Sequence, residues 1–351
     1  MSPEEIEAIE RLARLLQARK TATDAPPRRS WHLAAVLGAT LCVASVLLFA
    51  RVGRTAIDLE VEATSVGFSI DSEQILLRDV TLDGLGASGL SRIRLPEQVS
   101  SALGGPGILE EPDLSVRLSA AEAGGRRGVV RIAEIRLPAQ TAVDLQLTGP
   151  ASSYRLTLHE PGVPIDVGVF GPVTVAIAGL GSAVIDFTIP QGLALDPVAG
   201  SVDLDLDFRN VERTAMAPQI PVSRLEFWRL DEFGDRRLSV VRTLSTVRSG
   251  TIHFEELDGA SRTLRAGEIL RLPTIEEGWL RTVRLLDEGV SLAFHGQVRG
   301  LSTGADARAR SLMPTWLDWL RAQHGLSLLW GTTLYVAGVA AALLRWFKGG
   351  I

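Results

Sequence analysis

Cysteine and lysine are the residues that this 351-residue chain most clearly lacks. The single cysteine, Cys42, lies in an uncharged stretch near the N-terminus, so the rest of the chain can form neither a disulfide nor a thiolate metal site. The only lysines, Lys20 and Lys348, lie near the two ends. The residues between them therefore lack the lysine that a P-loop, a Schiff base or a Ser-Lys pair requires. The preference for arginine over lysine is typical of GC-rich bacterial genomes.

Other catalytic and binding signals are also scarce. There is no G-x-S-x-G sequence of the kind that positions a nucleophilic serine. Residues 1–30 carry a net charge of +1 and residues 345–351 carry +2, which leaves −8 on residues 31–344. An acidic region of this kind does not suit nucleic acid, which needs a basic surface. We therefore expect no nucleic-acid partner and no bound cofactor.

Two long uncharged stretches enclose most of the chain. Residues 31–50 and 326–344 are each about long enough to cross a bilayer as a helix, which takes roughly 20 apolar residues. Basic residues beside spans tend to stay in the cytoplasm, so both termini are expected there and the central region outside. The chain is thus predicted to be an inner-membrane protein, with a cytoplasmic short helix and linker at 1–30 and a cytoplasmic tail at 345–351.

Small residues recur at helical spacing inside both predicted spans. Such faces let helix backbones approach closely and favour association, either between the two spans or between subunits. The predicted packing residues are Ala34, Gly38, Cys42, Gly338 and Ala342.

A tryptophan-containing helix is predicted just before the second span, within residues 308–325. Trp316 and Trp319 share one face of this amphipathic segment. Tryptophans beside a span usually lie at the membrane surface, so these two are predicted interfacial anchors. The alternative is a helix that packs on the central region.

The central region alternates between apolar and polar residues, as half-buried strands do. Turns rich in glycine and proline separate the strands, and the triplet Arg-Leu-Pro at 94–96, 136–138 and 271–273 is expected to end three of them. The predicted fold is mainly β, a large extracytoplasmic β-sandwich or jelly-roll-like region between two transmembrane helices. The predicted strands are 57–62, 74–82, 114–120, 129–137, 143–147, 154–158, 173–177, 183–189, 202–208, 222–230, 238–244, 251–255, 269–272, 280–285 and 290–298.

A proline-containing segment, residues 215–221, divides this region by composition. No tryptophan occurs between residues 51 and 215, whereas several follow. We expect β-rich subdomains at 51–215 and 216–307, although the segment could instead be one loop in a single sheet system.

Three local patterns could indicate a binding or metal site, but each has a simpler structural explanation. Residues 84–89 match GxGxxG, but no helix is expected next, so a glycine-rich turn is favoured over a dinucleotide site. Alternating aspartates at 203, 205 and 207 indicate a solvated strand face rather than a calcium site. His253 and Glu255 share a strand face, but no third metal ligand lies nearby in sequence. No catalytic or metal residue is therefore assigned.

These observations favour a non-enzymatic accessory or scaffold subunit of a bacterial cell-envelope assembly. Its periplasmic β region would bind a partner protein, glycan or lipid, and membrane lipids, envelope proteins or further copies of the chain are the expected partners. One alternative is a lipid or glycan carrier with an apolar groove in the β region. Another is a periplasmic hydrolase with dispersed Ser, His and Asp residues, including His159, His253 and His295.

Overall fold

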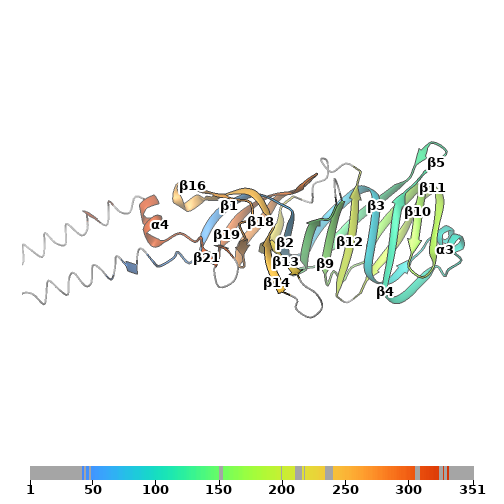
Figure 1. The fold of residues 1–351 in the computed structure, drawn as a ribbon, viewed down its shortest axis with the longest axis horizontal. Coiled ribbons are helices and arrows are strands. Elements are labelled where there is room, and N and C mark those ends of the chain that lie inside the picture. The colour runs from blue at the N-terminus through green and yellow to red at the C-terminus, as the bar shows by residue number, and fades with distance from the viewer. Residues whose placement is uncertain are drawn as a thin grey trace, which may run out of the picture. The chain divides into compact units, whose positions relative to one another are not determined.

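The structure is a computed structural model, and its β region is made of one large antiparallel sheet system (Figure 1). The described residues are 42, 45–46, 49–149, 153–198, 200–209, 216, 218–233, 240–304, 309–323, 327 and 330–331. The chain divides into two compact units, Met1–Arg51 with Thr315–Leu317, and Val52–Pro314 with Asp318–Ile351. The β region, Val52–Pro314, thus lies within one unit.

One set of strands forms an antiparallel sheet around β1. In order across the sheet the strands are β16 (Ala260–Leu264), β15 (Val247–Phe254), β1 (Thr55–Ala63), β19 (Gly289–Val298) and β18 (Ile275–Leu286). A one-turn 3-10 helix, η2 (Glu255–Leu257), follows β15. β1 lies at the centre because it pairs with β15 on one side and β19 on the other.

A second run of strands is joined to the first where β13 pairs with β18. Its order is β13 (Ile220–Phe233), β2 (Ser65–Ile70), β8 (Ala142–Leu147), β9 (Ser153–His159), β12 (Ser201–Phe208) and β3 (Gln74–Arg94). The short strands β14 (Val240–Ser245), β17 (Leu270–Leu272), β20 (Ser302–Thr303) and β21 (Arg310–Ser311) extend this run around β13. β1 and β2 come before residues 215–221 in sequence. However, β1 pairs with β15 and β19, which come after this segment, and β2 pairs with β13, which begins within it.

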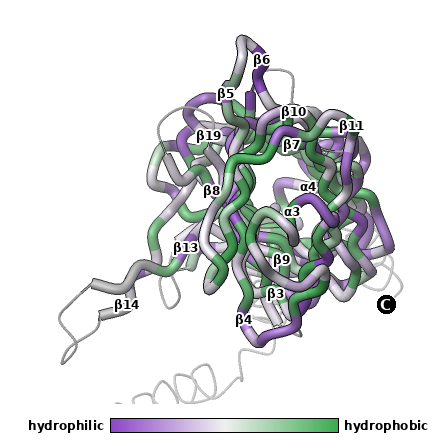
Figure 2. Tube along the Cα trace, turned by 90° about the vertical axis from the view of Figure 1, so that its right-hand side faces the viewer, coloured by the Kyte–Doolittle hydropathy of each residue, from purple (hydrophilic) through white to green (hydrophobic). Residues whose placement is uncertain are grey.

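The remaining long strands close on one another, as the end-on view in Figure 2 shows. β3 pairs with β7 (Val129–Leu137), β7 with β10 (Ile165–Ile177), β10 with β11 (Gly181–Pro197), and β11 with the end of β3. β4 (Ile108–Ala120) bridges β3 and β10. The helix α3 (Glu97–Leu103) follows β3, and β5 (Glu122–Ala123) pairs with β6 (Arg126–Arg127) in a separate hairpin.

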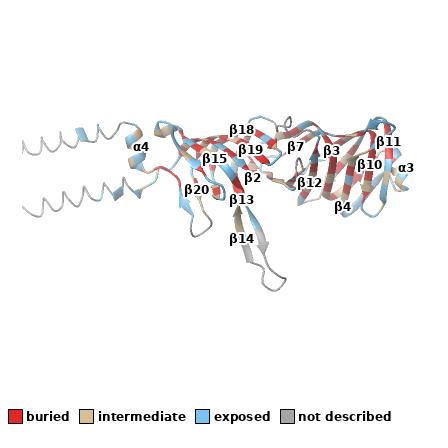
Figure 3. Cartoon of the chain, turned by 45° about the horizontal axis from the view of Figure 1, so that its top comes forward, coloured by how far each residue is buried: buried red, intermediate tan, exposed pale blue. Residues whose placement is uncertain are grey.

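Alternating sequence produces this fold, as the stripes of buried residues in Figure 3 illustrate. In β12 the residues Val202, Leu204, Leu206 and Phe208 are buried, while the aspartates between them face outward. The inward residues of all the long strands join a single hydrophobic cluster. Burial of apolar side chains at about 25 cal/mol per Å² is the main force that holds such a sheet system together.

Tyr154 connects two distant parts of the chain inside this core. Its hydroxyl lies 2.6 Å from the carbonyl oxygen of Gly289 and accepts a 3.1 Å hydrogen bond from the backbone N–H of Leu286. Burial raises the pKa of the Tyr154 phenol to about 12. The polar end of a buried tyrosine normally needs such partners, so this contact fixes β9 against the turn between β18 and β19.

The mainly β, sandwich-like prediction is confirmed, and most predicted strands are present. The glycine-rich turn predicted at 84–89 is wrong, because these residues continue β3 as a strand. Gly89 has φ 77°, and a Cβ there would lie 2.4 Å from the Ser201 carbonyl oxygen, so the glycine permits close approach of β12.

The predicted membrane spans, residues 31–50 and 326–344, lie mostly outside the described residues. Within the described part of the chain, no helix has both the length and the apolar character needed to cross a bilayer. Ala34, Gly38, Gly338 and Ala342 are outside this part. The predicted helix before the second span is present as α4 (Trp316–Ala322), which contains Trp316 and Trp319.

Candidate functional site

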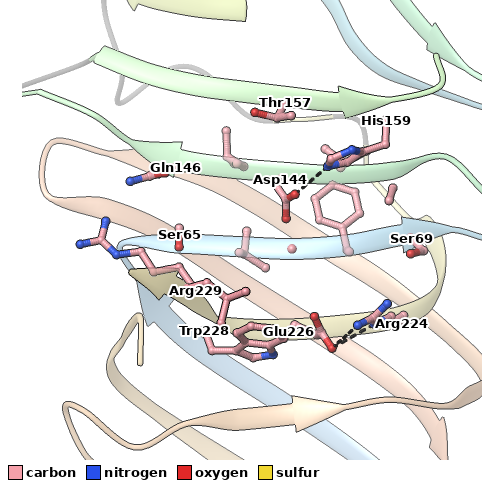
Figure 4. Close-up of a pocket in the computed structure, with 17 residues that line it drawn as sticks. Ser65, Ser69, Asp144, Gln146, Thr157, His159, Arg224, Glu226, Trp228 and Arg229 are labelled. Atoms are coloured by element: carbon pink, nitrogen blue, oxygen red, sulfur yellow. Dashed lines mark hydrogen bonds and ion pairs between the residues drawn. The ribbon is translucent and has the colours of Figure 1, made fainter. Parts of the chain in front are cut away.

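A polar hollow lies on the outer face of β2, β8, β9 and β13 (Figure 4). Its volume is about 560 Å³. Its polar lining residues are Ser65, Ser69, Asp144, Gln146, Thr157, His159, Arg224, Glu226, Trp228 and Arg229. The lining combines both signs of charge with hydroxyl, amide and indole groups.

Strand register brings these side chains together. Glu226 of β13 lies opposite Gly67 of β2, Gly67 lies opposite Asp144 of β8, and Asp144 lies opposite Thr157 of β9. Residues directly opposite on one face have Cβ atoms about 5 Å apart, so the four positions form a row across the strands. A Cβ at Gly67 would lie 2.6 Å from Asp144 Oδ1. The missing side chain therefore leaves room for the Asp144 carboxylate.

Two ion pairs hold charged groups of the hollow in place. His159 Nε2 lies 2.9 Å from Asp144 Oδ2, and Arg224 Nη2 lies 2.6 Å from Glu226 Oε1. Both pairs are drawn as dashed lines in Figure 4. Such exposed pairs add little to stability, about 0–1 kcal/mol, but they set the position of charge that a ligand would meet.

Trp228 supplies the aromatic part of the lining. The guanidinium carbon of Arg271 lies 4.7 Å from the ring centroid, an arrangement that favours a cation–π contact. The indole Nε1 is buried, and no described residue accepts a hydrogen bond from it. Leaving a buried donor without an acceptor costs about 1–3 kcal/mol.

The aspartate row of β12 continues the outer face beyond the hollow. Asp203 accepts a hydrogen bond from Thr157, Asp205 from Arg155, and Asp207 from Ser153, at 2.6, 2.8 and 2.6 Å. The hydrogen bond with Asp205 raises the pKa of the Arg155 guanidinium. Each carboxylate thus has a partner on β9.

A separate cluster joins Asp58, Glu255 and His295. His295 Nδ1 lies 2.9 Å from Asp58 Oδ1 and 3.1 Å from Glu255 Oε1, and one ligand atom from each residue lies within 4.8 Å of the others. The spacing of His253 and Glu255 predicted that both residues lie on one strand. Instead, β15 ends at Phe254 and Glu255 begins η2. The sequence pattern identified His253 and Glu255 but missed Asp58, because the carboxylate comes from a strand nearly 200 residues earlier.

Of the residues predicted to act in or beside the membrane, three are described. Cys42 is exposed, and Trp316 is 40% exposed at the start of α4. Trp319 lies one turn further along α4. Their predicted contacts with lipid or with another helix remain predictions.

No protein family model matches the chain, and none of the curated proteins resembles it significantly. The functional argument therefore depends on the geometry of this chain alone.

Proposed function

We propose that this chain is a membrane-anchored, non-enzymatic accessory subunit of a bacterial cell-envelope assembly. Its β region would lie in the periplasm and bind a partner protein through the polar hollow. Two predicted spans, residues 31–50 and 326–344, would hold it at the inner membrane with both termini in the cytoplasm.

The composition of the hollow is the observation that carries this proposal. Tryptophan and arginine are enriched among the residues that dominate protein–protein binding energy, and Trp228, Arg224 and Arg229 all line the hollow. The Asp144–His159 and Arg224–Glu226 pairs present both signs of charge at defined positions. Charge of this kind selects among partners and fixes their orientation.

The carrier alternative requires an open apolar groove. The inward residues of the strands, from Ile57 in β1 to Leu195 in β11, are buried against one another in the hydrophobic cluster. No observation on the described residues therefore favours an acyl chain between the sheets.

The hydrolase alternative requires a serine next to a histidine. His159 and His295 instead bond to carboxylates, Asp144 for the first and Asp58 and Glu255 for the second. Within the described residues, no serine hydroxyl is among the hydrogen-bond partners of these two histidines. An accessory role thus fits the described side chains better than hydrolysis.

Affinity purification of matched charge reversals tests the proposal. Asp144→Arg reverses a charge inside the hollow, and Asp186→Arg reverses a surface carboxylate on β11 that also has one ion-pair partner, Arg126. Both changes should leave folding intact, since surface ion pairs contribute only about 0–1 kcal/mol.

The full-length chain and both variants would be purified in mild detergent, and bound proteins, glycans and lipids identified by mass spectrometry. We expect a specific protein to accompany the wild type and Asp186→Arg but not Asp144→Arg. Equal recovery with both variants would contradict binding at the hollow. A glycan or lipid in place of the protein, or a monomeric chain recovered alone, would contradict the proposed partner class.

A further inference from the structure

We propose that Asp58, Glu255 and His295 form a binding site for one divalent transition-metal ion, with zinc as the test ion. This site is separate from the polar hollow and does not depend on the proposed accessory function. It is built from residues of β1, η2 and β19.

Register explains why the ligands meet. Asp58 lies directly opposite His295 in the β1–β19 ladder and directly opposite His253 in the β1–β15 ladder. Trp279 of β18 lies opposite His295 in turn. One carboxylate thus lies between two histidines in a row across four strands, and η2 turns Glu255 toward the same place.

The distances suit coordination. Metal–nitrogen and metal–oxygen bonds to zinc are about 2.0–2.2 Å long, so neighbouring ligand atoms lie about 3.0–3.5 Å apart in octahedral or tetrahedral geometry. The two distances from His295 Nδ1, 2.9 and 3.1 Å, are close to this range. Only small side-chain shifts would place all three ligand atoms around one ion.

Charge also favours a cation at this point. Asp58 Oδ1 and Glu255 Oε1 lie 2.9 and 3.1 Å from the same ring nitrogen, His295 Nδ1, so two carboxylates converge on one point. Arg281 Nη2 lies 3.3 Å from Asp58 Oδ1 and balances one negative charge, whereas the Glu255 carboxylate pairs with His295 and with no arginine of the described residues. A divalent ion between them would contact both carboxylates at once.

The donor set selects the class of metal. One imidazole and two carboxylates suit zinc and similar first-row ions, whereas calcium needs six to eight oxygens. Three protein ligands leave a fourth position in a tetrahedral site, which a water molecule can fill.

Trp279 supports the site and provides a way to observe it. Its ring stacks on His295 with an interplanar angle of 14° and a centroid distance of 6.4 Å, which orients the imidazole. Trp279, His295, Arg281 and Gln219 also line a small hollow of about 290 Å³, through which an ion could enter. A paramagnetic ion such as Co²⁺ at the site should quench Trp279 fluorescence.

Metal titration of the full-length, tag-free chain tests the proposal after treatment with a chelator. We expect one equivalent of Zn²⁺ to bind, and Co²⁺ to bind with visible absorption bands and with loss of tryptophan fluorescence. His295→Gln and Asp58→Asn should each weaken binding by about 10- to 100-fold or more. Trp279→Phe should abolish the quenching but keep the stoichiometry.

His159→Gln is the matched control, because His159 pairs with the Asp144 carboxylate and no third metal ligand among the described residues joins this pair. Its metal affinity should equal that of the wild type. Should His295→Gln or Asp58→Asn fail to fold, Glu255→Gln decides, since this exposed side chain is outside the core. The proposed site would be overturned if the wild type bound the metal no more tightly than Glu255→Gln. It would also be overturned if His159→Gln lost as much metal affinity as the ligand variants.

Discussion

The hydroxyl of Tyr154 is predicted to stabilise the β region by connecting β9 to the turn between β18 and β19. Tyr154→Phe removes that hydroxyl and keeps the aromatic ring, which packs edge-on against Phe208 at a centroid distance of 5.9 Å. The change leaves the Leu286 N–H without the acceptor that now lies 3.1 Å away, and it removes the donor near the Gly289 carbonyl.

The expected cost is about 2 kcal/mol, because leaving one buried backbone group unsatisfied costs about 1–3 kcal/mol. For a β region of this size, that loss lowers the melting temperature by about 4–8 °C. Urea unfolding of the purified full-length chain, followed by circular dichroism, would measure the change in midpoint at constant slope.

Thr174→Val is a suitable control for removing a hydroxyl. Thr174 is half-buried in β10, and valine keeps its branched shape. We expect this control to change stability by less than about 0.5 kcal/mol. If the free energy of unfolding of Tyr154→Phe is also within about 0.5 kcal/mol of the wild-type value, the hydroxyl does not stabilise the contact between β9 and the turn between β18 and β19.

Three further outcomes follow from the structure. The Tyr154 phenol has a pKa of about 12 in the fold and about 10 when unfolded, so its contribution to the free energy of unfolding should be fully present below pH 10 and be lost between pH 10 and 12. A urea midpoint that falls equally over this range in Tyr154→Phe would contradict this. Gly128→Ala places a Cβ 1.8 Å from a carbonyl oxygen of β10 and should lower the free energy of unfolding by about 3 kcal/mol. Gly192→Ala, whose Cβ would have no atom within 4 Å, should cost much less, and equal melting temperatures of the two variants would refute the packing argument. Gly67→Ala should displace Asp144 and weaken partner binding in the affinity assay with little loss of stability, and unchanged binding would show that the Asp144 position is unimportant.

Sequence periodicity predicts the strands well because burial on one face imposes strict alternation. The predicted strand 129–137 matches β7 in full, and the prediction for 202–208 falls one residue short of β12. The Arg-Leu-Pro triplets also end strands as expected, since β3 ends at Arg94, β7 at Leu137 and β17 at Leu272.

The failures have local causes. β2 was not predicted, because its sequence, Ser-Val-Gly-Phe-Ser-Ile, is short and contains a glycine that weakens the strand signal. The glycines of residues 84–89 indicated a turn, yet in β3 they accommodate neighbouring side chains, including those of Asp205 and Asp207. Glycine is ambiguous in this way because it serves both turns and close approach of strands.

The candidate sites could not be predicted from spacing along the chain. The polar hollow takes residues from four strands between Ser65 and Arg229, and the cluster of Asp58 and His295 joins positions 237 residues apart. Only register in the antiparallel ladders brings these side chains together. Short-range patterns therefore found Glu255 and His253 but not the carboxylate between the two histidines.

Cysteine labelling in intact cells tests most directly whether the β region lies outside the cytoplasm while the N-terminus lies inside. Cys42 is the only cysteine, so Cys42→Ser gives a background in which single cysteines can be introduced. We expect a membrane-impermeant maleimide to label Ser182→Cys, at an exposed position of β11, in cells with a permeabilised outer membrane. Lys20→Cys should react only after the inner membrane is opened. Equal labelling of both positions in intact cells, or labelling of Lys20→Cys alone, would contradict the membrane-anchored arrangement.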